Sequence, residues 1–142
     1  MLPALSLLKR HLRPLRLPLF SSPASCGFPS PADEYIDTAL DLNEHLIAHP
    51  AATFFVRAKG DSMIGAGIFE GDILIIDRSL TAQSGNIVLA VIDGEFTLKR
   101  FTRSQSEIWL HAENEKYPPV KITEDMDFTI WGVAIHCIHK LR

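Results

Sequence analysis

Two apolar runs joined by a two-residue turn constrain the fold of this chain most strongly. The runs are Asn86–Ile92 and Glu95–Phe101, and only Asp93 and Gly94 lie between them. Asp-Gly is a preferred pair for a type I′ turn, which joins two antiparallel strands tightly. The sequence therefore predicts a β-hairpin whose register follows from the turn. The expected pairs are Val88 with Lys99, Ala90 with Thr97, and Ile92 with Glu95.

Short β-rich runs continue on both sides of this hairpin. From Thr53 onward they are separated by glycine and aspartate, as is typical of antiparallel β structure. A chain of 142 residues is long enough for one substantial core. We therefore predict a mostly-β domain of about six or seven strands over residues 30–142. The expected strands are Thr53–Ala58, Asp72–Asp77, Asn86–Ile92, Glu95–Phe101, Glu107–His111 and Phe128–His139.

One helix is expected before the first of these strands. Ser30 is a suitable N-cap, Pro31 would occupy the first helical position, and Asp33 completes a pattern like a capping box. The helix should end near His49-Pro50, because a proline disfavours helical geometry in the residue before it. The residues at helical spacing are Ile36, Ala39, Leu40, Asn43, Leu46 and Ile47.

Residues 1–29 are expected to form a flexible arm. Its prolines repeatedly remove the backbone donors that a helix needs. Four basic residues interrupt its apolar stretches, so it matches neither a secretory signal nor a membrane span. We therefore expect no membrane association and a cytoplasmic location.

Charge is distributed unevenly along the chain. Residues 1–32 contain four bases and no acid, whereas residues 33–142 contain all 17 acids and the other 10 bases, a balance of −7. A body this acidic is poorly suited to binding DNA phosphates, so no direct specific DNA binding is expected. The two cysteines, Cys26 and Cys137, are too few for a disulfide-rich scaffold, which favours a reducing compartment. Cys137 lies in an apolar run and is expected to be an inert core thiol.

A serine in a glycine-rich turn is the first candidate for chemistry. Ser62 follows Gly60 and Asp61 just after a predicted strand. Neighbouring residues with small or short side chains allow backbone N–H groups to converge on one point, as an oxyanion hole requires. An ordinary turn with a solvated hydroxyl would explain the same residues, so Ser62 needs a base to act as a nucleophile.

Lys99 is the candidate base. None of the six histidines sits in a recognisable constellation, whereas the hairpin register places Lys99 on an apolar face with Val88 and Phe101. Lowering the pKa of a lysine from about 10.4 to about 7 requires about 4–5 kcal/mol of destabilisation of its charged form, and burial acts in that direction. A lysine whose head group reaches water would fit the pattern equally well.

Metal and nucleotide sites find no support in the sequence. The spacing of Asp61, Asp72 and Asp77 matches no metal-binding loop, and acids at strand ends are usually solvated. No glycine-rich phosphate-binding motif occurs. We therefore expect neither a metal nor a cofactor.

Three motifs together resemble the LexA-like self-cleaving serine peptidases, specifically their SOS-mutagenesis branch. The resemblance extends from about Phe20 to the carboxyl terminus and implies a LexA/signal-peptidase-like β domain. It also implies that Ser62 is the nucleophile and Lys99 the general base, with the backbone amides of Ser62 and Asp61 receiving the oxyanion. The bond that the protein cuts in itself would be Cys26–Gly27. The motifs are Cys26-Gly27-Phe28-Pro29-Ser30-Pro31, Gly60-Asp61-Ser62-Met63 and Asp93-Gly94-Glu95-Phe96-Thr97-Leu98-Lys99-Arg100.

The resemblance further implies partners. A RecA filament on single-stranded DNA would stimulate the cut, and residues 27–142 would then form a homodimer that acts with a UmuC-like error-prone DNA polymerase in translesion synthesis. Cleavage within one chain and cleavage across a dimer both remain open. Only 26 residues precede the scissile bond, too few for a repressor's DNA-binding domain, which favours a mutagenesis subunit over a repressor-like peptidase lacking that domain. The alternatives are a non-catalytic interaction module for a polymerase and a signal-peptidase-like enzyme acting on other proteins.

Overall fold

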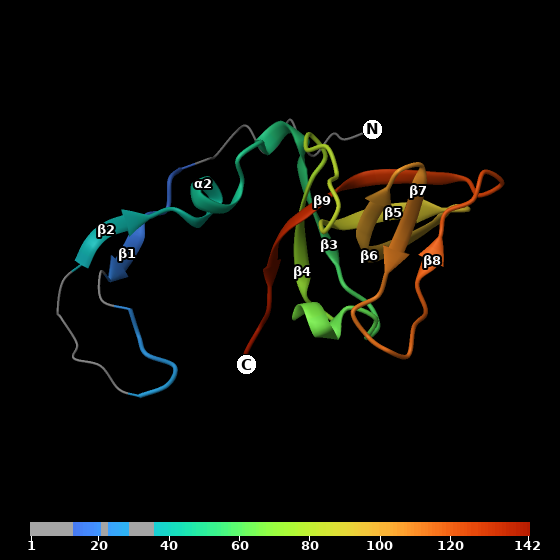
Figure 1. Cartoon of the computed structure of the whole chain (residues 1–142). Helices are drawn as coiled ribbons and strands as arrows, with labels where there is room; N and C mark the ends of the chain where they lie inside the picture. The colour runs from blue at the N-terminus through green and yellow to red at the C-terminus, as the bar shows by residue number, and fades with distance from the viewer. Residues whose placement is uncertain (1–12, 21–22, 29–35) are drawn as a thin grey trace. The chain divides into compact units, whose positions relative to one another are not determined.

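The computed structural model describes residues 13–20, 23–28 and 36–142 of the chain (Figure 1). The chain divides into two compact units, residues 1–48 and 49–142. In the first unit, strand β1 (Leu17–Phe20) pairs antiparallel with β2 (Ile36–Leu40), and the short helix α2 (Leu42–Leu46) follows. The boundary between arm and domain that the motifs suggest, at residues 29–30, lies outside the described residues.

The predicted helix is wrong over residues 36–40, which form strand β2. The backbone of this segment pairs with β1, where Leu40 lies opposite Leu17, and this tertiary pairing overrides the helical spacing of the apolar residues. The helix begins only at Leu42, because the Asp41 carboxylate caps it by accepting a hydrogen bond from the Asn43 amide at 3.0 Å. The predicted cap residues Ser30, Pro31 and Asp33 lie outside the described part of the chain.

Part of the predicted arm has a defined conformation. Residues 17–20 form strand β1, although Pro18 lies within it. A proline is tolerated there because a two-stranded sheet consists of edge strands, on which one missing donor can face solvent. Residues 17–20 are therefore paired with β2 instead of forming an unpaired part of the arm.

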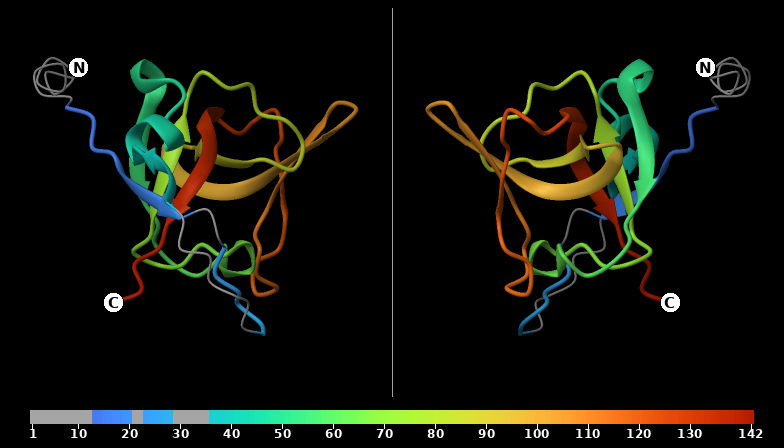
Figure 2. Two further views of the ribbon diagram at one scale, coloured as in Figure 1. Left: turned by 90° about the vertical axis from the view of Figure 1, so that its left-hand side faces the viewer. Right: turned by 90° about the vertical axis from the view of Figure 1, so that its right-hand side faces the viewer.

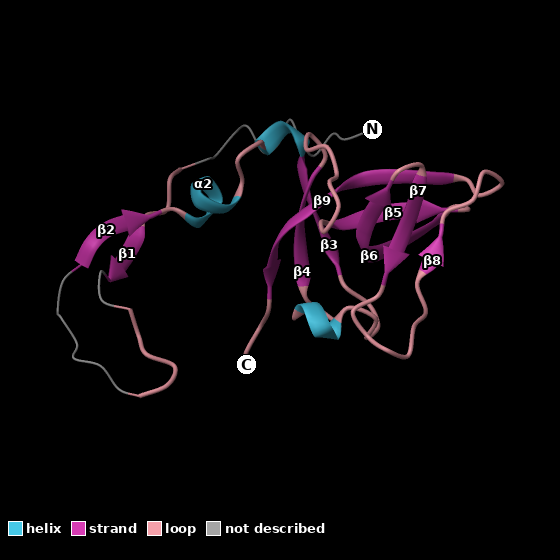
Figure 3. Cartoon of the chain, in the orientation of Figure 1, coloured by secondary structure: helices cyan, strands magenta, loops and turns pink. Residues whose placement is uncertain are grey.

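A seven-stranded antiparallel sheet forms the second unit (Figures 1 and 3). Its strand order is β3-β4-β9-β5-β6-β7-β8. Strand β9 lies between β4 and β5, and the sheet is visibly curved (Figure 2). The mostly-β fold class is confirmed, and β8 is the one strand of this sheet that the sequence did not predict. The bounds are β3 Thr53–Arg57, β4 Ile73–Asp77, β5 Ile87–Ile92, β6 Glu95–Ser104, β7 Glu107–His111, β8 Val120–Lys121 and β9 Phe128–Ile138.

The hairpin of β5 and β6 has the predicted register. Val88 lies opposite Lys99 and Ala90 lies opposite Thr97. The φ angles of Asp93 and Gly94 are 49° and 85°, both positive as a type I′ turn requires. Because side chains alternate along a strand, Thr97 and Lys99 project from the same face of β6.

Two clusters of buried side chains form the core of the second unit. Met63 and Ile68 belong to the first cluster, so the segment that carries Ser62 is packed against the sheet by its own apolar residues. Burial of these side chains holds the segment in place, because each would lose apolar contact if the loop moved. The first cluster is Ala58, Met63, Ile68, Leu74, Ile76 and Leu89, and the second is Val88, Ala90, Phe101, Leu110 and Val133.

Candidate active site

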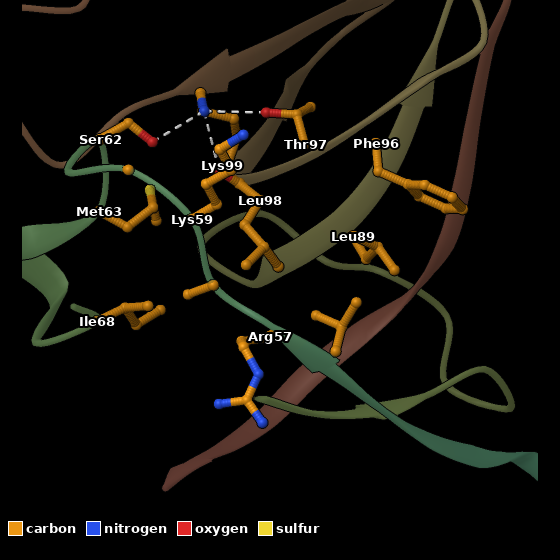
Figure 4. Close-up of a pocket in the computed structure, with 13 residues that line it drawn as sticks. Arg57, Lys59, Ser62, Met63, Ile68, Leu89, Phe96, Thr97, Leu98 and Lys99 are labelled. Carbon is orange, nitrogen blue, oxygen red and sulfur yellow. Dashed lines mark hydrogen bonds between the residues drawn. The ribbon is translucent and has the colours of Figure 1, made fainter. Parts of the chain in front are cut away.

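Ser62 and Lys99 line the same pocket of the second unit (Figure 4). Ser62 lies in the loop between β3 and the 3-10 turn Ile64–Ala66, whereas Lys99 lies in the middle of β6. The pocket has a volume of about 250 Å³. It therefore combines a hydroxyl, an amine and the charged side chains of Arg57 and Lys59 with apolar walls. Those walls include Val56, Met63, Ile68, Leu89, Phe96 and Leu98.

The amine of Lys99 contacts three oxygen atoms (Figure 4). Lys99 Nζ donates to Ser62 Oγ at 3.1 Å, to Thr97 Oγ1 at 2.9 Å and to the Leu98 carbonyl oxygen at 3.0 Å. The structure thus brings together the two side chains that the sequence selected, although 37 positions separate them. It also adds Thr97 as a contact of the amine.

Burial lowers the pKa of Lys99 below its ordinary value. The side chain is half-buried, and within the described ranges no carboxylate forms an ion pair with it. Because no carboxylate compensates the ammonium charge, removing water destabilises the charged form relative to the neutral amine. The environment therefore shifts Lys99 toward the neutral form that a general base needs.

The three contacts of Lys99 Nζ also suit a neutral amine. Such an amine has two N–H donors and one lone pair. The hydroxyl of Thr97 and the carbonyl of Leu98 can accept both N–H bonds, which leaves the lone pair facing the Ser62 hydroxyl. In that arrangement Ser62 donates its hydrogen bond to Lys99, the geometry from which a base removes a proton.

The turn before Ser62 has the backbone conformation that a glycine allows. Gly60 adopts a φ of 84°, in the left-handed region, and its amide donates to Glu70 Oε1 at 3.1 Å. The Ser62 amide donates to no acceptor within the part of the chain that the structure describes. The described contacts therefore leave this N–H group free for another acceptor.

Residues that sequence reasoning missed hold the loop from the other side. Tyr117 and Asn114 contact Asp61 from 56 and 53 positions further along the chain, and Glu113 contacts the Ser62 carbonyl. No local pattern could have indicated contacts over such separations. Thr97 could have been found, because it stands two positions before Lys99 on the same face of a predicted strand.

The candidate scissile bond lies in the first unit. Cys26 and Gly27 are both exposed, and the Gly27 amide donates to Ser25 Oγ at 3.3 Å. Phe28, which follows, is 92% exposed. The Cys26–Gly27 peptide is therefore open to attack from solvent or by a bound protein group.

The expectation that acids at strand ends are solvated is wrong for Asp72 and Asp77. Both are buried, with exposures of 4% and 1%. Each carboxylate contacts a histidine Nδ1 at 2.6 Å, Asp72 that of His139 and Asp77 that of His49. Hydrogen bonds from the Phe69 amide and from His139 lower the pKa of Asp72. These pairs fasten the two ends of β4 and are not among the residues that line the pocket.

The expectation of a core thiol at Cys137 is also wrong, because this residue is exposed. Its thiol donates to Asp72 Oδ2 at 3.4 Å. Desolvation of the sulfur and the bond to Asp72 raise the pKa of Cys137 to about 11. The thiolate is therefore scarce near neutral pH, and the side chain is a poor nucleophile.

The described residues lack two kinds of feature. They contain no group of three or more side chains that could hold a metal ion. They also contain no helix long and apolar enough to cross a membrane.

Comparison with known proteins gives consistent results. The chain matches the family described as Peptidase S24-like over residues 18–135, a range that contains Ser62 and Lys99. Protein ImpA of Escherichia coli is 43% identical over 125 residues, which cover 88% of this chain and 85% of ImpA. Protein SamA of Salmonella typhimurium is 45% identical over 125 residues, covering 88% of this chain and 86% of SamA. A LexA repressor of Shewanella oneidensis is 39% identical over 127 residues, covering 87% of this chain and 60% of the repressor.

Proposed function

This chain belongs to the Peptidase S24-like family and is similar to the UmuD-like proteins of SOS mutagenesis, and from that premise we propose that it cuts its own Cys26–Gly27 bond with a Ser62–Lys99 dyad. The observation that carries this proposal is the 3.1 Å contact between Lys99 Nζ and Ser62 Oγ in a pocket with apolar walls. A solvent-exposed lysine would be protonated and could not accept the serine proton.

Cleavage proceeds in two steps. Neutral Lys99 removes the Ser62 hydroxyl proton while Ser62 Oγ attacks the carbonyl carbon of Cys26. The backbone amide of Ser62, with that of Asp61, donates to the resulting oxyanion. The bond between Cys26 and the Gly27 nitrogen then breaks, and the Lys99 ammonium returns the proton to the leaving amine.

Water completes the reaction. Lys99, neutral again, removes a proton from a water molecule that attacks the ester between Ser62 and Cys26. The ester bond breaks, Ser62 Oγ regains a proton from Lys99, and Cys26 becomes the new carboxyl terminus. The products are residues 1–26 and 27–142.

The proposed role of the cut rests on the similarity to the SOS-mutagenesis proteins. We propose that a RecA filament on single-stranded DNA stimulates it, and that residues 27–142 then form a homodimer that acts with a UmuC-like error-prone DNA polymerase. Residues 33–142 of this chain carry a net charge of −7, which agrees with contact to DNA through partners rather than directly. The bond is cut either within one chain or across a dimer. To distinguish the two, a Ser62→Ala chain, which keeps the bond, is mixed with a differently tagged chain that keeps the dyad but is altered at Cys26. Only cleavage across a dimer can cut the Ser62→Ala chain.

The experiment that tests this function is self-cleavage of the full chain. The purified protein is incubated at pH 7 and at about pH 10, with and without RecA filaments, and the fragments are analysed by mass spectrometry. We expect a fragment beginning at Gly27, formed faster at the higher pH because more Lys99 is neutral. Ser62→Ala and Lys99→Arg should give none, since guanidinium stays protonated. An intact wild-type chain under all four conditions would overturn the proposal.

Cell-based mutagenesis separates this function from a non-catalytic interaction module. The Ser62→Ala chain should lose DNA-damage-induced mutagenesis along with the cut. If Ser62→Ala retains wild-type mutagenesis, the chain acts as a binding module and its pocket is not needed.

A further inference from the structure

Three residues of the segment 113–117 hold the loop that carries Ser62. Asn114 Nδ2 donates to the Asp61 carbonyl oxygen at 2.9 Å, and the Tyr117 hydroxyl donates to Asp61 Oδ1 at 2.5 Å. The Glu113 amide donates to the Ser62 carbonyl oxygen at 2.8 Å. Both carbonyl groups that flank the Ser62 side chain are therefore held by consecutive residues, Glu113 and Asn114.

The contact from Asn114 fixes more than a carbonyl group. The Asp61 carbonyl and the Ser62 N–H belong to one planar peptide, and this peptide is trans. In a trans peptide the two groups point in opposite directions. By holding the Asp61 oxygen on one side, Asn114 therefore directs the Ser62 N–H to the other side, and that N–H has no acceptor within the described residues.

The same segment is connected to the strand that carries Lys99. The Glu113 carboxylate pairs with Arg100, the residue after Lys99 on β6. The Glu113 carbonyl also accepts a hydrogen bond from the Gly65 amide at 2.8 Å. Segment 113–117 thus touches both the loop of the candidate nucleophile and the strand of the candidate base.

The segment is itself held rigidly. Asn114 Oδ1 accepts a hydrogen bond from the Lys116 amide at 3.1 Å, and the Asn114 carbonyl accepts one from the Tyr117 amide at 3.1 Å. The Asn114 side chain is half-buried. An amide held at both of its polar atoms has little rotational freedom, which is what a positioning group requires.

We propose that Asn114 is a positioning residue for self-cleavage, whose side-chain amide orients the Asp61–Ser62 peptide so that the Ser62 N–H faces the developing oxyanion. The inference rests on the proposed function, because it assigns a role within that reaction. Removing an oxyanion donor from other serine peptidases costs about 10²–10³ in rate. Loosening a donor that stays in place should cost less, about 10- to 100-fold.

Two substitutions isolate the donor. Asn114→Leu has a similar shape but no N–H group, whereas Asn114→His can still donate from a neutral ring. Neither retains the Oδ1 acceptor for Lys116, so that loss is common to both, and only the His variant can still donate to the Asp61 carbonyl. Glu115→Ala, an exposed neighbour, is the control. Each full chain is assayed for cleavage from pH 7 to about pH 11 without RecA, and its thermal unfolding is followed by circular dichroism.

We expect Asn114→Leu to lower the plateau rate at high pH about 10- to 100-fold with an unchanged pH midpoint, because Lys99 is not touched. Asn114→His should cleave faster than Asn114→Leu, and Glu115→Ala should match the wild type. Equal rates for Asn114→Leu and the wild type would overturn the inference while leaving the proposed function intact. Three other results would also overturn the inference. They are equal cleavage rates for Asn114→Leu and Asn114→His, a loss of rate that a shifted pH midpoint explains, and a loss of rate that accompanies unfolding of both variants. A wild-type chain that does not cleave overturns the proposed function itself.

Discussion

The hydroxyl oxygen of Thr97 lies 2.9 Å from Lys99 Nζ, one step along the same face of β6. This contact decides two properties of the amine at once. An oxygen acceptor orients the amine, and it also stabilises the ammonium form more than the neutral form. Thr97 therefore opposes the effect of burial on the pKa of Lys99 while holding Nζ toward Ser62.

Thr97→Val should separate these two effects. Without the acceptor, the pKa of Lys99 falls further, so the midpoint of the pH profile of self-cleavage moves to lower pH. The plateau rate should fall as well, because the amine is less well oriented. Thr97→Ser keeps the hydroxyl and should resemble the wild type. A midpoint that stays or rises in Thr97→Val would show that Thr97 does not act on the amine.

Lys99→Met should raise the melting temperature by a few degrees near pH 7. Burial lowers the pKa of Lys99 in the folded state below its unfolded value of 10.5, so the charged side chain destabilises the fold at low pH. This penalty disappears as pH rises from the folded pKa toward 10.5, and the difference between variant and wild type should shrink accordingly. The comparison is made in a Ser62→Ala background to prevent cleavage.

The control for that measurement is Lys59→Met. Lys59 lines the same pocket but is exposed, so its ammonium group stays in contact with water and its replacement should not raise the melting temperature. A stability difference for Lys99→Met that does not vary between pH 7 and pH 10.5 would contradict the burial argument.

Phe101→Ala should cost about 3–5 kcal/mol of unfolding free energy, because a large side chain is removed from a packed core. Phe101 is 1% exposed and belongs to the second core cluster. Phe55→Ala is the matched control, since Phe55 is 59% exposed, and it should cost about 1 kcal/mol or less. Urea unfolding in a Ser62→Ala background measures the unfolding free energy of both variants. Equal losses would contradict the placement of Phe101 in the core and of Phe55 at the surface.

Gly65→Ala should slow self-cleavage at least about 10-fold, a loss of positioning comparable to that of a misplaced catalytic group. A Cβ atom at Gly65 would lie 2.6 Å from the Glu113 carbonyl oxygen, so the loop of Ser62 would have to move away from segment 113–117. Gly132→Ala creates a similar clash with Ile76 Cγ2, at 2.5 Å, but within the sheet. It should lower the melting temperature and leave the cleavage rate at low temperature largely unchanged. Slower cleavage in Gly132→Ala together with unchanged cleavage in Gly65→Ala would contradict the structure.

Local pattern was sufficient for the hairpin and for the candidate dyad. The Asp93-Gly94 turn sets the register of β5 and β6, because a two-residue turn leaves one way to pair the strands. That register alone places Lys99 on an apolar face. Ser62 was found through the glycines around it and through motifs that resemble a known family. The residues that set the hairpin lie within a few positions of one another, whereas Ser62 and Lys99 are 37 positions apart and were assigned as a pair through the family resemblance.

The rest depended on contacts between distant segments. Residues 36–40 have helical spacing, yet they form a strand because β1 offers partners for their backbone groups. The burial of Asp72 depends on His139, which reaches it only after β9 has paired with β4. Asn114 likewise meets Asp61 across 53 positions. The sequence by itself therefore determined six strands of the seven-stranded sheet, the hairpin register and the two candidate side chains, Ser62 and Lys99. Only the tertiary structure decided how the Ser62 peptide is oriented, because its hydrogen-bond partners come from another part of the chain.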